Sequence, residues 1–240
     1  MARLPSTYVL VHGAWHGGWC WRRVADRLTA AGHRVFTPTL TGVGERRHLL
    51  TRGVNVDTHV EDILGVLEAE ELEDVVLTGH SYAGLVISGV AARAPQRLRR
   101  LVYLDALLVE DGQSWADAFS PEVAEARRKG VVTVDGVSAI PPPDPAIYGF
   151  ADASDETWVR RLLTPHPYAA FEQRMRWGCP LANGLPRLYI DCAAPAIPTL
   201  SPMKARYRAR PDWPFVEMQT GHDAMVSAPE DLTRLLLEQR

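Results

Sequence analysis

The alternation of short apolar runs with helical patterns constrains the fold of this chain more than any other feature of its sequence. Six β-rich, largely apolar runs recur at residues 8–11, 34–38, 74–79, 100–105, 187–191 and 214–219. Near-continuous apolar strands bounded by turn residues are typical of a parallel sheet covered on both faces. Apolar residues at helical spacing lie between them, at 18–31, 57–69 and 229–239. The pattern predicts a doubly wound α/β fold with a mainly parallel sheet.

Local signals set the expected ends of these helices. Gly32 follows the first helix as a stop signal, and Pro229 stands where the last helix begins. Either Asn55 or Asp57 caps the start of the middle helix.

The interval from 106 to 186 breaks the rhythm of strand and helix. It contains the run PPPDP at 141–145 and many scattered aromatic residues, but no strand of the buried type. Such an interval is too long for a plain connection and needs structure of its own. We therefore predict a core made of residues 1–105 and 187–240, with residues 106–186 inserted as a mainly helical cap.

Composition excludes several classes of function. The chain has 240 residues, of which 46% are hydrophobic and 23% charged, and its net charge is −3. It shows neither a basic stripe for nucleic acid nor an apolar stretch approaching the ~18 residues of a membrane span. We expect no nucleic-acid or membrane partner, and a protein that works as a monomer or homodimer.

The cysteines and the N-terminus indicate a location. Cys20, Cys179 and Cys192 are odd in number and widely spaced, which gives neither a disulfide framework nor a zinc pattern. The apolar run near the N-terminus is too short for a signal peptide. We expect a cytoplasmic protein.

The stretch LTGHSYAGLV, residues 77–86, carries the strongest chemical signal. Gly79, Ser81 and Ala83 match the pattern G-x-S-x-G with alanine in the last place, between a strand and a helix. In a nucleophile elbow the turn is strained, and small neighbours let it hold the serine out for reaction. The alternative is that Ser81 only caps a helix.

A histidine near the C-terminus favours the catalytic interpretation. A serine hydroxyl is a weak nucleophile without an adjacent base. His222 follows the last expected strand, on a loop, and stands after the serine in the order typical of this kind of triad. We predict that Ser81 is the nucleophile and His222 the base.

The segment VLVHGAWHGGWCW, residues 9–21, follows the first strand and supplies a candidate oxyanion hole. Two backbone N–H groups must point to where negative charge develops. The small residues Gly13 and Ala14 let this backbone approach a substrate closely. His12 and His16 lack a third metal ligand nearby, and no dinucleotide or phosphate-loop motif is present. We expect no metal and no cofactor.

These motifs resemble those of the α/β-hydrolase superfamily over nearly the whole chain. VHGAWHGGWCW together with GHSYAG is similar to the plant methyl esterase and hydroxynitrile lyase group, and to small bacterial esterases that include carbamate-cleaving enzymes. The resemblance implies Ser81 as nucleophile, His222 as base, and the N–H groups of Ala14 and Tyr82 as the oxyanion hole.

Two departures from the lyases indicate an esterase. The lyases have threonine where this chain has Gly13, and lysine directly after the catalytic histidine where this chain has Asp223. The plant enzymes also place an acid just after the strand at 187–191, whereas this chain continues CAAPAIPTL without a carboxylate.

The acid of the triad is therefore open between two aspartates. Asp105 ends the strand at 100–105, at the sheet edge where active-site groups of open α/β sheets collect. Asp191 is the rival, although it falls within a predicted strand. We predict Asp105.

The expected function is hydrolysis of a small carboxylic or carbamic ester through an acyl-enzyme. Aromatic residues of the cap, with Trp115, Trp158 and Trp177 as candidates, line a pocket for an apolar or aromatic substrate. Cys20 is expected to be a packed thiol, although a supporting role near the pocket stays open. The alternative function is a small-ligand receptor of the same fold with little turnover.

Overall fold

The computed structural model describes residues 5–240, and its centre is a six-stranded sheet. Every neighbouring pair of strands is parallel, in the order β2-β1-β3-β4-β8-β9. The strands are β1 (Thr7–Val11), β2 (Arg34–Phe36), β3 (Val75–His80), β4 (Leu98–Leu104), β8 (Arg187–Cys192) and β9 (Phe215–Met218).

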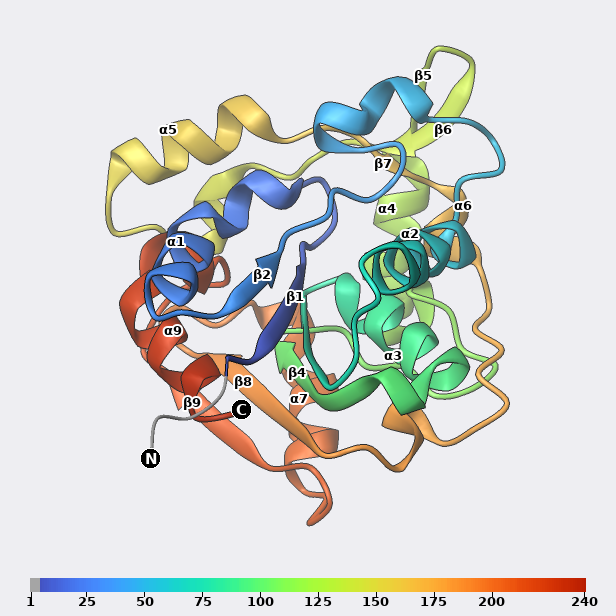
Figure 1. Cartoon of the computed structure of the whole chain (residues 1–240). Coiled ribbons are helices and arrows are strands. Elements are labelled where there is room, and N and C mark those ends of the chain that lie inside the picture. The colour runs from blue at the N-terminus through green and yellow to red at the C-terminus, as the bar shows by residue number, and fades with distance from the viewer. Residues whose placement is uncertain (1–4) are drawn as a thin grey trace.

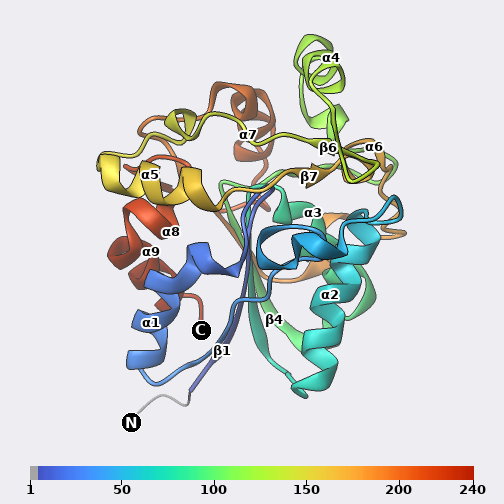
Figure 2. The same cartoon turned by 90° about the horizontal axis from the view of Figure 1, so that it is seen from above.

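Helices cover both faces of the sheet (Figures 1 and 2). On one face α1 (Arg22–Ala30) packs against α9 (Pro229–Leu237), next to the short helix α8 (Ala224–Ser227). On the other face α2 (Val56–Ala69) packs against α3 (Ala83–Arg93). The sheet therefore divides the interior into two apolar cores.

Side-chain alternation along the strands produces the two cores. In β1, Tyr8 and Leu10 pack with the α1–α9 side, whereas Val9 and Val11 pack with the α2–α3 side. Successive residues of a strand point to opposite faces, so a strand buried on both sides must be apolar throughout. This explains why the runs in the sequence are continuous rather than alternating.

The predicted fold class and strands are confirmed. Each of the six predicted runs overlaps one strand of the sheet, and the helix ends follow the local signals. Gly32 has a left-handed φ of 86° just after α1. Asn55, rather than Asp57, caps α2: its side chain accepts from the N–H of Thr58, whose hydroxyl in turn accepts from the N–H of Asn55.

The inserted segment 106–186 contains both helices and a small sheet. Its elements are α4 (Pro121–Lys129), β5 (Val132–Val134), β6 (Val137–Ile140), α5 (Ala153–Leu162), β7 (His166–Pro167) and α6 (Ala169–Glu172). The three antiparallel strands were not expected, because runs of two to four residues carry too little period to be recognised in sequence. Figure 2 shows α4 standing out from the body of the protein.

Within residues 5–240, no helix has both the length and the apolar character needed to span a membrane.

The start of α3 is packed against the chain that leaves β4. A Cβ atom added at Gly84 would lie 2.1 Å from the carbonyl oxygen of Leu107, which is backbone and cannot easily move. The N–H of Leu107 donates to the carbonyl of Ser81 at 2.8 Å, which fixes this approach. The helix can begin directly after residue 82 only because residue 84 has no side chain.

We expect Gly84→Ala to destabilise the protein by about 1–3 kcal/mol, the usual cost of overpacking a tight site. Urea unfolding of the purified variant measures this change. The matched control is Gly65→Ala in α2, where an added Cβ meets nothing within 4 Å. That change should stabilise the helix by roughly 0.5–1 kcal/mol. Equal effects of the two substitutions would contradict the packing argument.

Candidate active site

Ser81 occupies a strained turn between β3 and α3. Its φ is 53°, a left-handed value that costs a residue with a side chain free energy. Three backbone hydrogen bonds hold the turn: the N–H of Ser81 donates to Leu104 at 3.0 Å, and its carbonyl accepts from Gly84 at 3.0 Å and Leu107 at 2.8 Å. The strain is thus supported by neighbouring backbone on both sides, as in a nucleophile elbow.

His222 is paired with Asp105. The Nδ1 of His222 lies 2.6 Å from Oδ2 of Asp105, and both residues are buried. Burial alone would raise the pKa of Asp105, but the hydrogen bond and charge of His222, together with Lys204, hold that pKa below its usual value. The carboxylate therefore stays ionised and fixes one tautomer of the imidazole, with hydrogen on Nδ1.

The second oxygen of Asp105 is also fully engaged. Oδ1 accepts from the N–H of Cys192 at 3.2 Å and forms an ion pair with Lys204. Lys204 is only 5% exposed. Burial lowers the pKa of its ammonium group, but Asp105 and Asp191 raise that pKa by more than burial lowers it, so the group stays charged. Both oxygens of the buried acid therefore have partners, which fixes its orientation.

Asp191, the rival acid, has other partners. Its carboxylate pairs with Lys204 at 2.7 Å and with Arg208. Of the two aspartates considered from sequence, the structure places Asp105 against His222. Lys204 was missed in the sequence, because nothing there distinguishes it from the neighbouring basic residues Arg206 and Arg208 of α7 (Ser201–Arg208).

A second buried carboxylate–histidine pair lies behind the first. Oδ2 of Asp223 is 3.0 Å from Nε2 of His16, and Nε2 of His80 donates to the carbonyl of His222 at 3.1 Å. Burial would lower the pKa of His16, but Asp223 outweighs it and raises the pKa. Burial likewise opposes ionisation of Asp223, yet His16, followed by His80 and His222, lowers its pKa to about 2. The residue that distinguishes this chain from the lyases thus anchors the 12–18 loop to the loop of His222.

The same residues were considered as metal ligands. Donor atoms of His80, His222 and Asp223 lie within 4.8 Å of one another. However, Nδ1 of His222 is bound to Asp105, Nε2 of His80 donates to a carbonyl, and Asp223 holds His16. These three residues therefore belong to a hydrogen-bond network in which each of them already has a protein partner.

The 12–18 loop brings backbone N–H groups beside Ser81. A Cβ at Gly13 would lie 2.9 Å from Cβ of Ser81, so residue 13 must be small for this contact. His12 fixes the loop: its Nε2 accepts from Leu40 at 3.0 Å and its Nδ1 donates to Gly13 at 2.8 Å. Within the part of the chain that the structure describes, neither the Ala14 nor the Tyr82 N–H donates to protein.

Side chains also support this edge of the site. The hydroxyl of Tyr82 and Nδ1 of His59 lie 2.8 Å apart, and Nε2 of His59 donates to the carbonyl of Thr41 at 2.9 Å. Burial lowers the pKa of His59 to about 4, so the ring is neutral. Nδ1 then accepts from the hydroxyl and fixes Tyr82, the residue whose N–H borders Ser81.

Ser81 and His222 border a common narrow cavity of about 60 Å³. Its walls are mostly apolar and come from the 12–18 loop, the inserted segment and the chain after β8, as Trp15, Leu107, Trp115, Phe119, Arg127, Pro143, Ile147, Tyr148, Ile197, Thr199 and Leu200. The volume is far below the ~300–1,000 Å³ of typical ligand pockets. The space beside Ser81 is therefore small for a substrate of ordinary size.

The tryptophans predicted to line a pocket separate into two groups. Trp115 lines the cavity, but Trp158 and Trp177 do not. Trp158 packs on Trp19 with ring centroids 5.3 Å apart, and Nε1 of Trp177 donates to Val109 at 3.4 Å. The expectation for Trp158 and Trp177 is corrected: aromatic density in the sequence does not show which rings face the cavity and which hold the inserted segment to the core.

Cys20 is a packed thiol. It is fully buried within the core on the α1–α9 side. Burial raises the pKa of its thiol well above the usual value, so the reactive thiolate does not form.

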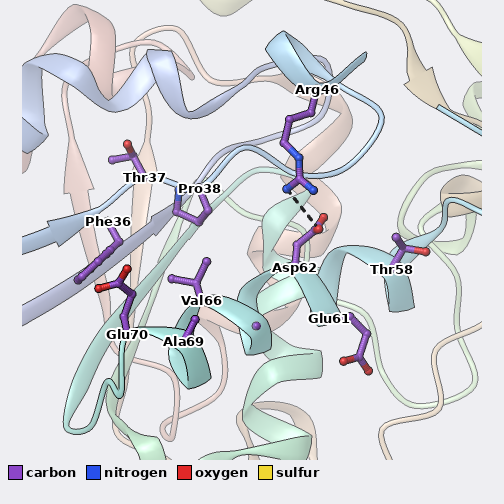
Figure 3. A pocket seen from close by; sticks show the side chains of 11 residues that line it. Phe36, Thr37, Pro38, Arg46, Thr58, Glu61, Asp62, Val66, Ala69 and Glu70 are labelled. Carbon is purple, nitrogen blue, oxygen red and sulfur yellow. Dashed lines mark hydrogen bonds and ion pairs between the residues drawn. The ribbon is translucent and has the colours of Figure 1, made fainter. Parts of the chain in front are cut away.

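A wider groove lies elsewhere, between β2 and α2 (Figure 3). Its volume is about 640 Å³, and it includes Phe36, Glu61 and Glu70. The one ion pair drawn there joins Arg46 and Asp62. Asp62 also accepts from the N–H and hydroxyl of Thr41, so its charge fixes the chain around residue 41. None of the candidate catalytic residues lines this groove.

Because His16 is paired with Asp223, we expect the contribution of His16 to stability to depend on pH with opposite signs in the wild type and in Asp223→Asn. In the wild type the raised pKa of His16 contributes stability below about pH 6.5 that is lost as the pH rises through the folded-state pKa. In Asp223→Asn burial, the largest influence on the His16 pKa, lowers that pKa against the hydrogen bond to the Ala14 carbonyl, so we expect the contribution of His16 to fall as the pH drops. We expect the stability deficit of the variant to widen by on the order of 1 kcal/mol between about pH 8 and pH 5.5.

Urea unfolding at several pH values measures this deficit. Asp26→Asn, at an exposed position of α1, is the matched control and should differ from the wild type by the same small amount at each pH. A deficit of Asp223→Asn that stays constant with pH would show that the pair does not hold His16 protonated.

Comparison with known proteins places this geometry in a family. A family model described as "Alpha/beta hydrolase family" matches residues 8–235. The chain is 41% identical to the "Carbendazim hydrolyzing esterase" of Nocardioides sp. (strain SG-4G), over 96% of this chain and 98% of that protein. It is 25% identical to the pheophorbidase of Raphanus sativus, over 96% and 92% of the two chains.

Solved structures agree on the fold. An extracellular alpha/beta-hydrolase from a Paenibacillus species superposes with a TM-score of 0.81 at 23% identity, covering 98% of this chain and 99% of that one. The Nocardioides esterase is similar to this chain over nearly its full length. This similarity, together with the family match, identifies the protein as an ester hydrolase. The chain belongs to the alpha/beta hydrolase family.

Proposed function

We propose that the protein is a serine esterase that cleaves a small, mainly apolar or aromatic carboxylic or carbamic ester through an acyl-enzyme. The observation that carries the proposal is the buried 2.6 Å contact between His222 and Asp105, on the wall of the cavity that Ser81 shares. A fixed imidazole that lines the same cavity as a partly exposed serine is the arrangement that a serine nucleophile needs for activation.

In the proposed reaction, the Ser81 oxygen attacks the ester carbonyl carbon while Nε2 of His222 accepts its proton. Asp105 stabilises the imidazolium that forms. The proton then passes to the leaving alcohol oxygen as its bond to the carbonyl carbon breaks. Water repeats the sequence on the acyl-enzyme and releases the acid.

The N–H groups of Ala14 and Tyr82 receive the negative charge on the carbonyl oxygen. Both N–H groups are without protein partners in the described chain; Tyr82 directly follows Ser81, and Ala14 directly follows Gly13, whose backbone approaches Ser81 closely. Removing one such donor in other hydrolases costs a factor of about 10²–10³ in kcat. The backbone thus supplies a large share of the proposed catalysis.

The nature of the cavity wall supports the proposed substrate class. It is built mainly from apolar and aromatic side chains, which favour an apolar substrate. The relative named for carbendazim hydrolysis motivates including that compound and simple carbamates beside methyl and aryl esters. We further propose that the protein works in the cytoplasm, in agreement with its three free cysteines.

Steady-state hydrolysis of p-nitrophenyl acetate, followed by a panel of methyl esters, aryl esters, carbamates, lactones and carbendazim, tests the proposal directly. The panel ranks substrates by kcat/KM. Failure of the folded protein to turn over any member would contradict the proposed function.

Ser81→Ala and His222→Ala should each remove nearly all esterase activity, by a factor on the order of 10⁶ in kcat if the groups act as one unit. The double variant should be little worse than either single variant, because the residual rate no longer uses the unit. Circular dichroism confirms folding. Retention of more than about 1% of activity by folded Ser81→Ala would exclude Ser81 as the nucleophile.

Asp105→Asn and Asp191→Asn form a matched pair that tests the acid. Asp105→Asn keeps the shape but offers His222 an unsuitable partner, so kcat should fall roughly 10²–10⁴-fold with little change in KM. Asp191→Asn disturbs Lys204 and Arg208 but does not remove the contact between Asp105 and His222, so it should cost less than about tenfold in kcat. The assignment is wrong if the second substitution is the more damaging one.

A further inference from the structure

The cavity beside Ser81 has an unusual electrostatic character for an apolar pocket. Arg127 lines it, and among the described residues that form its wall none is an aspartate or a glutamate. A buried or half-buried cation without a counter-charge is costly, and a ligand that supplies a negative charge would offset that cost.

Arg127 differs in this respect from its neighbours on α4. Arg128 pairs with Glu172 at 2.8 Å, and Lys129 lies 3.7 Å from Glu125. Arg127 forms no ion pair within residues 5–240, and its Nε is buried without a hydrogen-bond partner there. Burial lowers the pKa of the guanidinium, although this group still remains protonated at neutral pH.

Aromatic rings hold the guanidinium in place. Its Cζ lies 4.7 Å from the ring centroid of Phe119, 5.6 Å from that of Trp15 and 5.8 Å from that of Trp115. Cation–π contacts of this kind orient an arginine without occupying its N–H groups. The contacts explain how Arg127 stays at the cavity, but they leave its donors unused.

Two further donors of the same wall also lack partners. The hydroxyl of Tyr148 and Nε1 of Trp115 are buried, and neither has a hydrogen-bond partner in the described chain. Both residues are 2% exposed. Burial raises the pKa of Tyr148 well above its usual value, so its hydroxyl keeps its proton and can donate.

Tyr148 also ties these donors to the reacting groups. Its ring centroid is 5.5 Å from that of His222, and its carbonyl accepts the N–H of His222 at 2.9 Å. The residues that carry these unpartnered donors therefore line the same cavity as the proposed nucleophile and base, and buried donors of this kind normally find an acceptor.

We infer that Arg127, with Tyr148 and Trp115, forms a subsite that binds a carboxylate on the non-reacting end of the substrate. A carboxylate supplies two acceptor oxygens and the missing negative charge, and guanidinium recognises that group in bidentate geometry. The aromatic rings around the arginine suit a planar ring next to the carboxylate. The inference rests on the proposed esterase function and narrows its substrates to esters that carry an acidic group.

A binding experiment tests the subsite without turnover. Calorimetry on Ser81→Ala measures the dissociation constants of benzoate and of benzamide, its neutral isostere. We expect benzoate to bind more tightly, and Arg127→Met in the same background to weaken benzoate at least about tenfold while changing benzamide little. Arg128→Met on the same helix is the matched control and should retain the preference.

Conservative variants keep the test valid if Arg127→Met does not fold. Arg127→Lys retains the charge and should keep part of the preference for benzoate. Tyr148→Phe removes only a hydroxyl and should weaken benzoate several-fold. Equal binding of the two ligands, no measurable binding of benzoate, or a preference that survives Arg127→Met would each overturn the inference.

Turnover provides the second measurement. For the otherwise wild-type protein, the ratio of kcat/KM for monomethyl terephthalate to that for methyl 4-carbamoylbenzoate should fall at least about tenfold in Arg127→Met, mainly through KM. Arg127-dependent benzoate binding without hydrolysis of any ester would refute the proposed function and keep the subsite. Ester hydrolysis with no effect of Arg127 on either measurement would refute the subsite alone.

Discussion

The buried carboxylate of Asp105 joins four separate parts of the chain, and the geometry of the site depends on it. It stands at the end of β4, accepts an N–H from the end of β8, pairs with Lys204 of α7, and holds His222 on the loop after β9. A carboxylate in so dry a position is costly unless every oxygen has a partner. Full engagement of both oxygens offsets that cost and fixes the relative positions of the loops that carry the chemistry.

A second constraint works beside the first one. Asp223 and His16 form a separate buried pair, and His80 links it to the backbone of His222. One carboxylate therefore orients the side chain of His222, while the other holds the 12–18 loop and the backbone around His222. The two acids have different tasks although they stand close together in space.

Much of this arrangement could be predicted from sequence, because the informative features are local. The continuous apolar runs gave the six strands, and the glycine and alanine around Ser81 indicated the elbow. The order of residues along the chain placed His222 and Asp105 at the same edge of the sheet. The contact between them depends on backbone positions at strand ends, which parallel topology determines.

The parts that could not be predicted depend on packing between distant segments. Lys204 meets Asp105 only because α7 lies across the ends of β4 and β8, and nothing in the local sequence indicates this. Trp158 of α5 packs on Trp19, whereas Trp115 lines the cavity. Nothing in the local sequence distinguishes these two tryptophans. The short strands β5, β6 and β7 arise from pairing within the inserted segment, since none is long enough to show a period.

The inserted segment leaves the sheet after β4 and returns in β8, and these two strands are direct neighbours, with Leu101 opposite Arg187. The two strands that bound the segment therefore remain neighbours whatever the length or sequence of the chain between them. Evolution can exchange that segment, and with it most of the cavity wall, while the six strands and the residues at their ends keep their register. In an architecture of this kind, the proposed catalytic residues lie on the core, whereas most residues of the cavity wall lie on the inserted segment. New specificities can therefore arise through changes in one contiguous stretch of the gene.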